Sequence, residues 1–582
     1  MKNISIKIIL AFTLLGLLTV QCKKDMATLN QNPNQVTNPD VGQLLTNALY
    51  NTCGNEYLQW FYNGSVYFWR FEQLTVARGG TSFDFNTVGA LGGDESNMYS
   101  VMIDMKEIRS RIDAMPEPDK TNYQKFRAIT YIPQIYLGIR ATDWMGSMPY
   151  NEAVDARYTG NLTPKYDTQQ DLFNTWLSEL DNAITVLTAN DPNQVSPANQ
   201  DFIFQGDYTA WARLANSLKL RIATRLEKAD NAKMLQVLSE IVSQKDGSGN
   251  LLLITDATQQ AVWAPSANEM GPGGTNSLWI ENYAPSQNFS KFMVKNQDPR
   301  LGIFFVENDL TDVAIDSLKV SGVTIPKFAT QPVVEPWERL IGAPVAPDSN
   351  AITDYFGSTL TDRNGKMYSR LPYVDYNLIK PQQNNRNGQY ENIFLGAPEV
   401  CLYLAEFIEK GYVSGIGTAK DWYEKGVRLS CQNYDGKASL AQVTNYATRA
   451  ISSAQIDNLL AQPAVQYVNG DQGNVEKIIL QEMVNFFDNP YEGVAVARRT
   501  GYPSRNSTIW AWEPYWVSSV EMKLPRRFPW STPTDATNKA NWQAALTQQG
   551  FTADDITFSV LNSQRVWWDQ NCPDYGNGGI AK

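Results

Sequence analysis

The reactive side chains available in this 582-residue chain are too few in kind for most enzymatic mechanisms of hydrolysis. The sequence has no histidine, so it offers no Ser-His-Asp or Cys-His nucleophile, no histidine general base and no His-ligated zinc site. It also lacks P-loop, GxGxxG, CxxC and HExxH patterns. Two facing carboxylates would suffice for glycoside hydrolysis, and a chain with 60 Asp and Glu residues contains many pairs. The spacing of these residues does not distinguish any one pair as catalytic. A glycoside hydrolase is therefore kept as one of the alternative functions.

The cysteines are not spaced like a metal site. Cys53, Cys401, Cys431 and Cys572 are far apart in sequence. In an exported protein these four could form disulfides with any of three connectivities. Cys401 and Cys431 fall in or beside predicted helices, so buried free thiols are as well supported as disulfides. No EF-hand pattern occurs, and a Ca²⁺ site built from loop carbonyls and carboxylates stays open. No other cofactor is indicated.

Aromatic side chains supply the most abundant binding chemistry. They make up 12% of the chain, with 16 Trp and 28 Tyr. Most must form core, but amphipathic rings also suit stacking on sugar rings. They gather in or beside a Gly-rich stretch, 78–93, and a Trp-, Tyr- and Asn-rich stretch, 263–287, and loops of this kind carry binding residues or simply connect helices. We predict stacking surfaces and hydrogen-bond partners there: Trp69, Phe83, Trp279 and Tyr283 as rings, with Asp84 and Asn282 as polar partners.

The elements that must hold these loops are amphipathic helices. Residues 205–226 begin with Asp207 as a good N-cap and repeat apolar residues every three or four positions, and 231–243 follows after a short turn. The pair is typical of a helical hairpin, and its first helix has tetratricopeptide-like spacing. Similar stripes predict helices at 38–49, 94–113, 121–142 with a kink at Pro133, 168–188, 398–410, 418–430 and 474–488.

Between about residues 251 and 397 the helical period fades. Pro, Gly and Asn increase, and the runs 301–306 and 317–328 favour short strands. We therefore expect a mostly α protein, in which four tetratricopeptide-like hairpins pack against a loop-rich layer with a few short strands. Farther on, Trp510 and Trp512 are separated by a single residue. This spacing fits equally well the edge of a strand and a stacking ledge, that is, an exposed surface on which a ligand ring could stack.

The N-terminal residues predict export. Residues 1–21 combine Lys2 and Lys7 with an apolar run too short for a confident membrane span. Cys22 follows, then a polar stretch to residue 37. We expect a lipoprotein signal peptide (1–21), an anchor and tether (22–37) and one binding domain (38–582), with a simply secreted protein as the alternative. The net charge of −11 argues against nucleic acid as a partner.

Several sequence blocks carry a family resemblance. GDYTAWARLANSLKLRIATRL (206–226) resembles the "G-D…W…AN-S-L-x-L-R…R-L" helix of the SusD/RagB family of outer-membrane nutrient-binding lipoproteins. Other blocks agree in the same order: TDWMGSMPYNEA (142–153), PKYDTQQDLFNTWLSELDNAI (164–184), DPRL (298–301), PEVCLYLAEFIEKG (398–411), EKIILQEMVNFFDNPYEGVAVARRTGYP (476–503) and RVWWD (565–569).

The resemblance implies a function without hydrolysis. Family members are anchored at the cell surface of the outer membrane through a lipidated cysteine, here Cys22. They bind a nutrient, most often an oligosaccharide, and deliver it to a TonB-dependent transporter of the SusC type, over which they sit as a lid. The rivals are a secreted or surface glycoside hydrolase and a scaffold that only holds other proteins. The sequence does not name the ligand.

Overall fold

A computed structural model describes residues 39–54, 60–78, 87–88, 91–265, 282–345, 359–379, 388–517 and 519–579. The predicted signal peptide, Cys22 and the tether lie outside the described residues, as do Phe83, Asp84 and Trp279. Within the described ranges, no helix is both long enough and apolar enough to cross a membrane.

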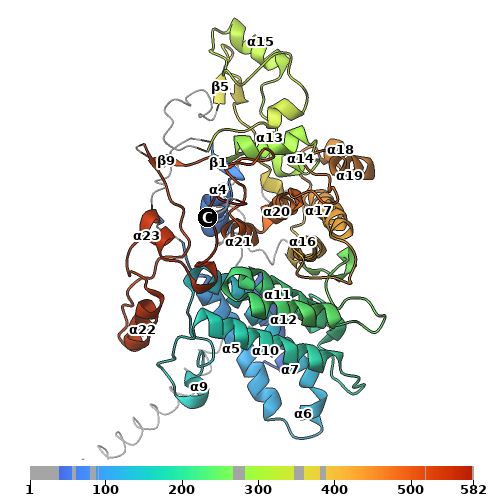
Figure 1. Ribbon diagram of the computed structural model, residues 1–582, viewed down its shortest axis with the longest axis vertical. Coiled ribbons are helices and arrows are strands. Elements are labelled where there is room, and N and C mark those ends of the chain that lie inside the picture. Colours follow the sequence, from blue (N-terminus) through green and yellow to red (C-terminus); the bar gives the residue numbers. More distant parts are fainter. Residues whose placement is uncertain are drawn as a thin grey trace, which may run out of the picture.

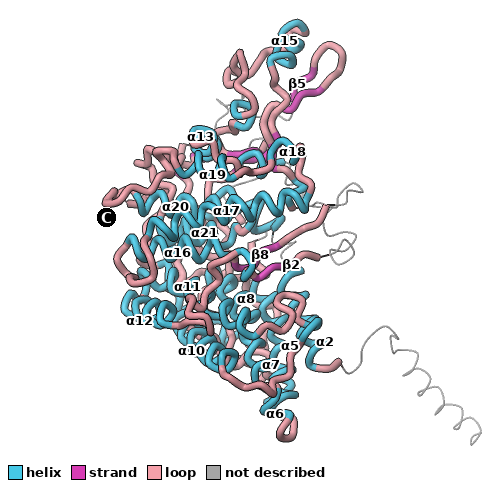
Figure 2. The backbone as a smooth tube through the Cα atoms, turned by 90° about the vertical axis from the view of Figure 1, so that its right-hand side faces the viewer, coloured by secondary structure: helices cyan, strands magenta, loops and turns pink. Residues whose placement is uncertain are grey.

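The described chain is mostly helical (Figure 1). Its N-terminal half contributes helices that pack in succession: α2 (Val41–Gly54), α5 (Asp94–Asp113), α7 (Gln124–Ile129), α8 (Tyr131–Met145), α10 (Gln169–Thr188), α11 (Tyr208–Ala229) and α12 (Asn231–Ser243). Its C-terminal half adds a second group: α16 (Ala397–Glu409), α17 (Ala419–Ala441), α20 (Asn474–Asn485) and α21 (Pro490–Thr500). Figure 2 shows the two groups stacked one above the other. The predicted fold class, helical hairpins with a loop-rich layer, is confirmed.

The predicted helical hairpin at 205–243 is α11 and α12. The Asp207 carboxylate accepts a hydrogen bond from the Ala210 N–H at 3.0 Å and so satisfies one free donor of the first turn. Trp211 and Leu218 are buried on the stripe that the spacing predicts. α12 begins with a second cap, in which the Lys233 N–H donates to Asp230 at 3.0 Å. Local capping and periodicity therefore define this pair.

The helix predicted at 121–142 with a kink at Pro133 is instead interrupted three residues earlier, at Thr130. α7 ends at Ile129 and α8 begins at Tyr131. A proline inside a helix lacks its N–H and clashes with the carbonyl four residues before it, which here belongs to Ile129. The break therefore falls where that carbonyl must turn away.

The strand predicted at 317–328 is wrong in its first part. Residues Asp312–Val320 form helix α15, capped by Thr311, whose hydroxyl accepts from the Ala314 N–H at 3.2 Å. Ala314, Ile315 and Leu318 lie buried at helical spacing, a signal that the β-favouring Val residues obscured. The run 301–306 is a helical turn, α14 (Leu301–Phe304), followed by the short strand β4 (Phe305–Val306).

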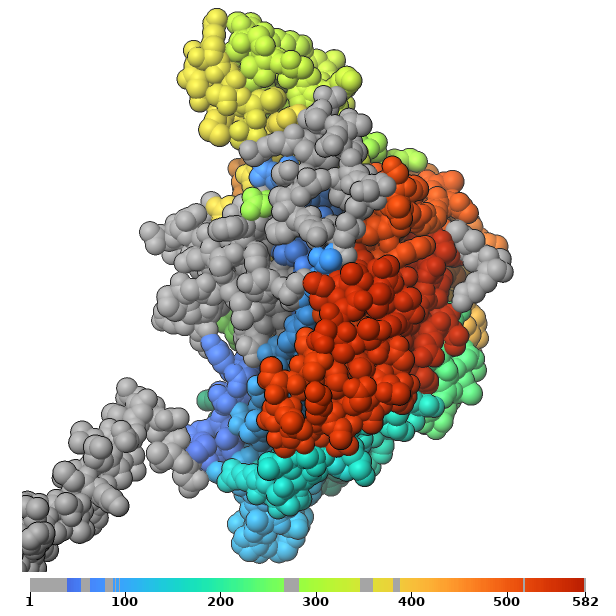
Figure 3. Space-filling model, turned by 90° about the vertical axis from the view of Figure 1, so that its left-hand side faces the viewer, coloured from blue at the N-terminus to red at the C-terminus, as the bar shows by residue number. Residues whose placement is uncertain are grey.

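α15 belongs to a small projecting lobe. The hairpin of β5 (Thr359–Thr361) and β6 (Met367–Ser369) packs there, and Leu310, Ile315 and Tyr368 contribute to a separate small core. The lobe projects at the top of Figure 1, and Figure 3 shows it standing clear of the C-terminal residues, drawn in red, that cover one face of the helices.

The strands form two-stranded ladders. β1 (Thr75–Ala77) pairs with β3 (Tyr283–Pro285), β2 (Ala261–Trp263) with β8 (Asn392–Leu395), β4 with β7 (Tyr373–Val374), and β9 (Trp516–Val517) with β10 (Val520–Glu521). All four pairings are antiparallel. Except for the β9–β10 hairpin, their partners lie far apart in sequence, so these ladders join the loop-rich segments to the helical body.

The sequence blocks that carry the family resemblance meet in the core through buried ion pairs. Arg225 of α11 lies between Asp143 at 2.9 Å and Glu492 at 2.8 Å. Arg221 with Glu399 at 2.7 Å and Arg498 with Asp569 at 3.3 Å likewise join different blocks, whereas Asp298 with Arg300 at 2.6 Å is a buried pair within the DPRL block. A buried charge is tolerated only when it is paired and hydrogen-bonded. These residues therefore hold the scaffold together, and none of these pairs is placed to meet a ligand in solvent.

A neighbouring cluster joins α16, α20 and α21. Arg499 contacts Glu406 at 2.6 Å and Glu482 at 2.7 Å. Burial and the charge of Glu406 raise the pKa of Glu482 well above its ordinary value. Burial also acts on Glu406, but Arg499 and Lys410 hold the pKa of that carboxyl below its usual range. Of these two carboxyl groups, Glu406 is therefore the one that the neighbouring cations favour in its charged form.

Cys401, Cys431 and Cys572 are buried free thiols, and Cys53 is buried as well. Burial raises the pKa of Cys401, Cys431 and Cys572 to about 12. Of the two alternatives that the sequence leaves open, the free thiols are therefore the ones present.

Candidate functional site

The two stretches predicted to bind a ligand adjoin the same end of one strand pair: one follows β1, and the other precedes β3. In the β1–β3 ladder Ala77 lies opposite Tyr283, and the Arg78 N–H donates to the Asn282 carbonyl at 2.8 Å. The chain leaves β1 at Arg78 and enters β3 from Asn282. Because the strands are antiparallel, the segment after β1 and the segment before β3 start side by side.

The same end of the ladder meets the base of the projecting lobe. One Arg78 guanidinium nitrogen donates to the Ser369 hydroxyl at 2.7 Å, and the guanidinium carbon lies 4.9 Å from the centre of the Tyr373 ring. Burial raises the pKa of Tyr373, so the phenol stays neutral beside the arginine. Arg78 thereby links β1, β6 and β7 at the place where the loops begin.

The base of this site is rigid because several backbone groups fix it. The Ser286 N–H donates to the Leu74 carbonyl at 2.9 Å, and the Glu513 N–H donates to the Gln73 side-chain oxygen at 2.9 Å. At Gly342 the chain passes so close to β3 that a Cβ would lie 1.8 Å from the Pro285 carbonyl oxygen. Only glycine fits at that approach.

Trp69 and Tyr283 do not form an exposed stacking surface, contrary to prediction. Trp69, in the short helix α4 (Trp69–Phe71), has an exposed fraction of 0%. Its ring stacks on Phe487 with centroids 4.9 Å apart, and its indole N–H donates to the Phe487 carbonyl at 2.7 Å. Tyr283 is 2% exposed, and burial raises its pKa to about 12. Both rings are covered by partners hundreds of residues away, which local sequence does not show.

Asn282 is exposed at the mouth of the ladder. Phe83, Asp84 and Trp279 lie outside the described residues, in the segments that leave from Arg78 and Asn282. The structure therefore brings the ends of both predicted loops together, and the roles of these residues stay predictions.

The later tryptophans divide between core and surface. Trp510 and Trp512 are 1% and 6% exposed and pack on Phe289 and Tyr575, so neither the strand edge nor the stacking ledge describes them. Trp516, which the sequence reasoning did not select, is 43% exposed in β9. It follows Tyr515, whose hydroxyl donates to the Arg70 carbonyl. A cluster of rings in sequence does not reveal which one faces solvent.

Comparisons with known proteins agree with this architecture. A SusD-like family model, described as "Starch-binding associating with outer membrane", matches residues 33–323 and 345–529. The family model does not match residues 324–344. These residues lie in the projecting lobe and in the segment that returns from the lobe and hydrogen-bonds beside β3. No curated protein matches the sequence.

Solved structures share the fold. A SusD homologue from Bacteroides fragilis is 22% identical, with a TM-score of 0.63, covering 92% of this chain and 100% of that one. A structure named chitin-binding protein is 21% identical, with a TM-score of 0.63 and coverage of 91% and 100%. A chitin-binding SusD homologue from Flavobacterium johnsoniae is 19% identical, with a TM-score of 0.60 and coverage of 91% and 99%.

Proposed function

Because the chain belongs to the SusD-like family of starch-binding proteins that associate with the outer membrane, we propose that it captures an oligosaccharide at the cell surface. The β1–β3 ladder is the observation that carries the proposal for this molecule. It joins two aromatic-bearing segments at one rigid base, and rings on adjacent loops can stack on successive sugar units. Phe83 and Trp279 are the proposed stacking rings, with Asp84 and Asn282 as hydrogen-bond partners.

The protein is a binding protein and not an enzyme. Hydrolysis of a glycosidic bond needs two carboxyl groups that flank the bond, whereas the proposed residues include one, Asp84. The family description and the names of the chitin-binding structures refer to binding. The chemistry of the proposed rings is tolerant of sugar type, so starch-like and chitin-like oligosaccharides are both suitable ligands.

A calorimetric screen of the purified protein against a glycan panel tests this function. We expect saturable binding of at least one oligosaccharide with no release of reducing ends during prolonged incubation. Trp279→Ala should weaken that binding by roughly 1–3 kcal/mol, by analogy with base stacking on aromatic rings. Tyr158→Ala, which removes an exposed ring from the distant short helix α9 (Ala156–Thr159; Figure 1), is the matched control. Product formation would favour the glycosidase, and absence of binding across the panel would favour the protein scaffold.

We also propose a membrane anchor and a transporter partner. Lipidation of Cys22 would hold the protein on the membrane surface, and a surface-held binding protein needs a separate channel to move its ligand inward. The family relationship supports a TonB-dependent barrel of the SusC type as that channel.

Detergent extraction of outer membranes provides the test of both ideas. We expect the native protein to co-purify with a large barrel after mild cross-linking, and Cys22→Ala to appear folded in the soluble fraction. Recovery of the cross-linked protein alone would reject the transporter partner. Unchanged membrane retention of the Cys22 variant would reject the anchor.

A further inference from the structure

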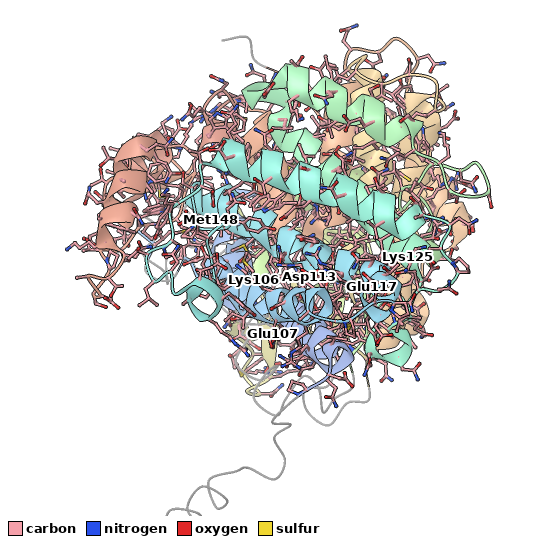
Figure 4. The ribbon with its side chains drawn as sticks, turned by 90° about the horizontal axis from the view of Figure 1, so that it is seen from below. Lys106, Glu107, Asp113, Glu117, Lys125 and Met148 are labelled. Carbon is pink, nitrogen blue, oxygen red and sulfur yellow. The ribbon has the colours of Figure 1, made fainter. Side chains whose placement is uncertain are left out.

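A cavity of about 620 Å³ lies away from the β1–β3 ladder, and its described lining shares no residue with that site. Small-molecule sites usually occupy roughly 300–1,000 Å³. Its walls come from the end of the Gly-rich stretch with the start of α5, from the turn that follows α8, and from the C-terminal segment around Trp530. Figure 4 shows Met148, one of the lining residues, between α5 and the C-terminal helices. The cavity therefore lies where three distant parts of the chain meet.

An array of aromatic rings builds one wall. The Trp530 ring centroid lies 5.7 Å from that of Tyr166, 6.3 Å from Trp542 and 6.0 Å from Phe551. The Trp530 indole N–H donates to the Met145 carbonyl at 3.2 Å, which fixes the ring. Trp530 and Trp542 are almost fully buried, whereas Tyr166 is half-buried. The wall is therefore preformed, with Tyr166 as its more open ring.

Two polar atoms in the cavity have no hydrogen-bond partner within the described chain. They are the buried Oε2 atom of Glu95 and the hydroxyl oxygen of Tyr166. In contrast, the Tyr99 hydroxyl donates to the Pro149 carbonyl at 2.9 Å, and the Ser147 N–H donates to Gln549 at 2.8 Å. A buried acceptor without a partner costs free energy unless water or a ligand satisfies it.

The remaining lining limits the chemistry of the ligand. Among the described lining residues there is no lysine or arginine and the acidic residue is Glu95, so this part of the lining does not favour an anion. Pro149, Pro164 and Pro529 add apolar surface around the rings. The lining suits a molecule with an apolar ring face, no negative charge and a hydrogen-bond donor at its edge.

We propose that this cavity is a second ligand site, which binds an uncharged ring-shaped molecule that carries a hydroxyl group. Its apolar face lies against the aromatic wall, and its hydroxyl pairs with Glu95. A pyranose ring and a phenolic ring both have this chemistry. The described lining includes Val88, Leu91 and Gly92 from the end of the Gly-rich stretch 78–93, but none of the residues proposed to bind the oligosaccharide, so either proposal can fail without the other.

Three probes test the second site and distinguish a pyranose ligand from a phenolic one. The probes are methyl β-D-glucopyranoside, phenol and phenyl β-D-glucopyranoside. Saturation-transfer NMR and quenching of tryptophan fluorescence report binding to the full mature protein. We expect at least one probe to bind saturably. Binding of the methyl glucoside without phenol identifies a sugar site, binding of phenol without the methyl glucoside identifies an aromatic site, and binding of both or of the phenyl glucoside alone supports the shared chemistry.

Two variants locate the binding. Ser531 is an exposed lining residue, so Ser531→Trp should block the cavity and weaken binding by about tenfold or more without disturbing the fold. Glu95→Ala should weaken it by roughly tenfold through loss of the hydrogen bond. Ser248→Trp, at an exposed turn elsewhere, is the matched control. Absence of saturable binding by all three probes, or binding that Ser531→Trp leaves unchanged, would overturn the proposal even if the Glu95 variant fails to fold.

Discussion

Replacing Glu492 by alanine will lower the free energy of unfolding by about 3–5 kcal/mol, the usual cost of removing one partner from a buried ion pair. The side chain of Glu492 is 1% exposed and lies 2.8 Å from Arg225 and 3.4 Å from Arg221. The Tyr403 hydroxyl also donates to it at 3.1 Å. Without the carboxylate, two guanidinium groups share the core with less negative charge to balance them.

The loss should depend on pH in a defined direction. Burial alone would raise the pKa of Glu492, but Arg221 and Arg225 lower it from 4.5 to about 2. A carboxyl whose pKa is depressed by folding stabilises the protein above its unfolded pKa, and that contribution disappears as pH falls toward the folded pKa. The difference between wild type and Glu492→Ala should therefore be constant above about pH 5 and shrink between 4.5 and 2.

Urea unfolding followed by circular dichroism measures this loss. The matched control is Glu424→Ala, which removes an exposed partner 3.7 Å from Lys420 on α17. Surface pairs of this kind contribute about 0–1 kcal/mol. If both variants lose equally little stability, the buried network does not hold the repeats together.

Trp69→Ala should also cost about 3–5 kcal/mol of unfolding free energy, as large-to-small changes of buried tryptophans do. The substitution removes a fully buried ring, its stacking on Phe487 and a hydrogen bond to the Phe487 carbonyl. Trp516→Ala, which removes an exposed ring, should stay within about 0.5 kcal/mol of wild type.

Thermal or urea unfolding distinguishes these outcomes, and calorimetry on the folded fraction adds the ligand test. We expect the remaining folded Trp69 variant to bind oligosaccharide as wild type does. A variant with wild-type stability and weakened binding would restore Trp69 to the ligand site.

Local signals predicted the helices well. Residues 94–113 and 231–243 match α5 and α12 at both ends, because the apolar period is local and, in α12, the Asp230 cap marks the start. The helix predicted at 418–430 instead continues to the end of α17, at Ala441. Long-range pairing was not accessible in the same way. Trp69 is covered by Phe487, and no pattern near residue 69 indicates that partner.

The candidate site was predicted only in part for the same reason. Composition identified the two loops, but their meeting depends on the pairing of Thr75 with Pro285. The second cavity depends on Tyr166 lying beside Trp530, which sequence reasoning missed, and its sole local signal is the density of Pro, Trp and Tyr. The family blocks, in turn, supply buried ion pairs such as Arg225 with Asp143 and Glu492, so they specify the scaffold and not the ligand.

The β1–β3 ladder also has a consequence for the order of folding. Helices α5 to α12 lie between its strands and form mostly local contacts, whereas the ladder must close the whole intervening chain. Contacts of high sequence separation carry a larger loop-closure entropy and form slowly. The helical hairpins should therefore collapse first, and their compaction brings Thr75 and Pro285 within reach. The folding chain therefore acquires its scaffold before it acquires the candidate ligand site, and a chain that ends before residue 282 never acquires that site.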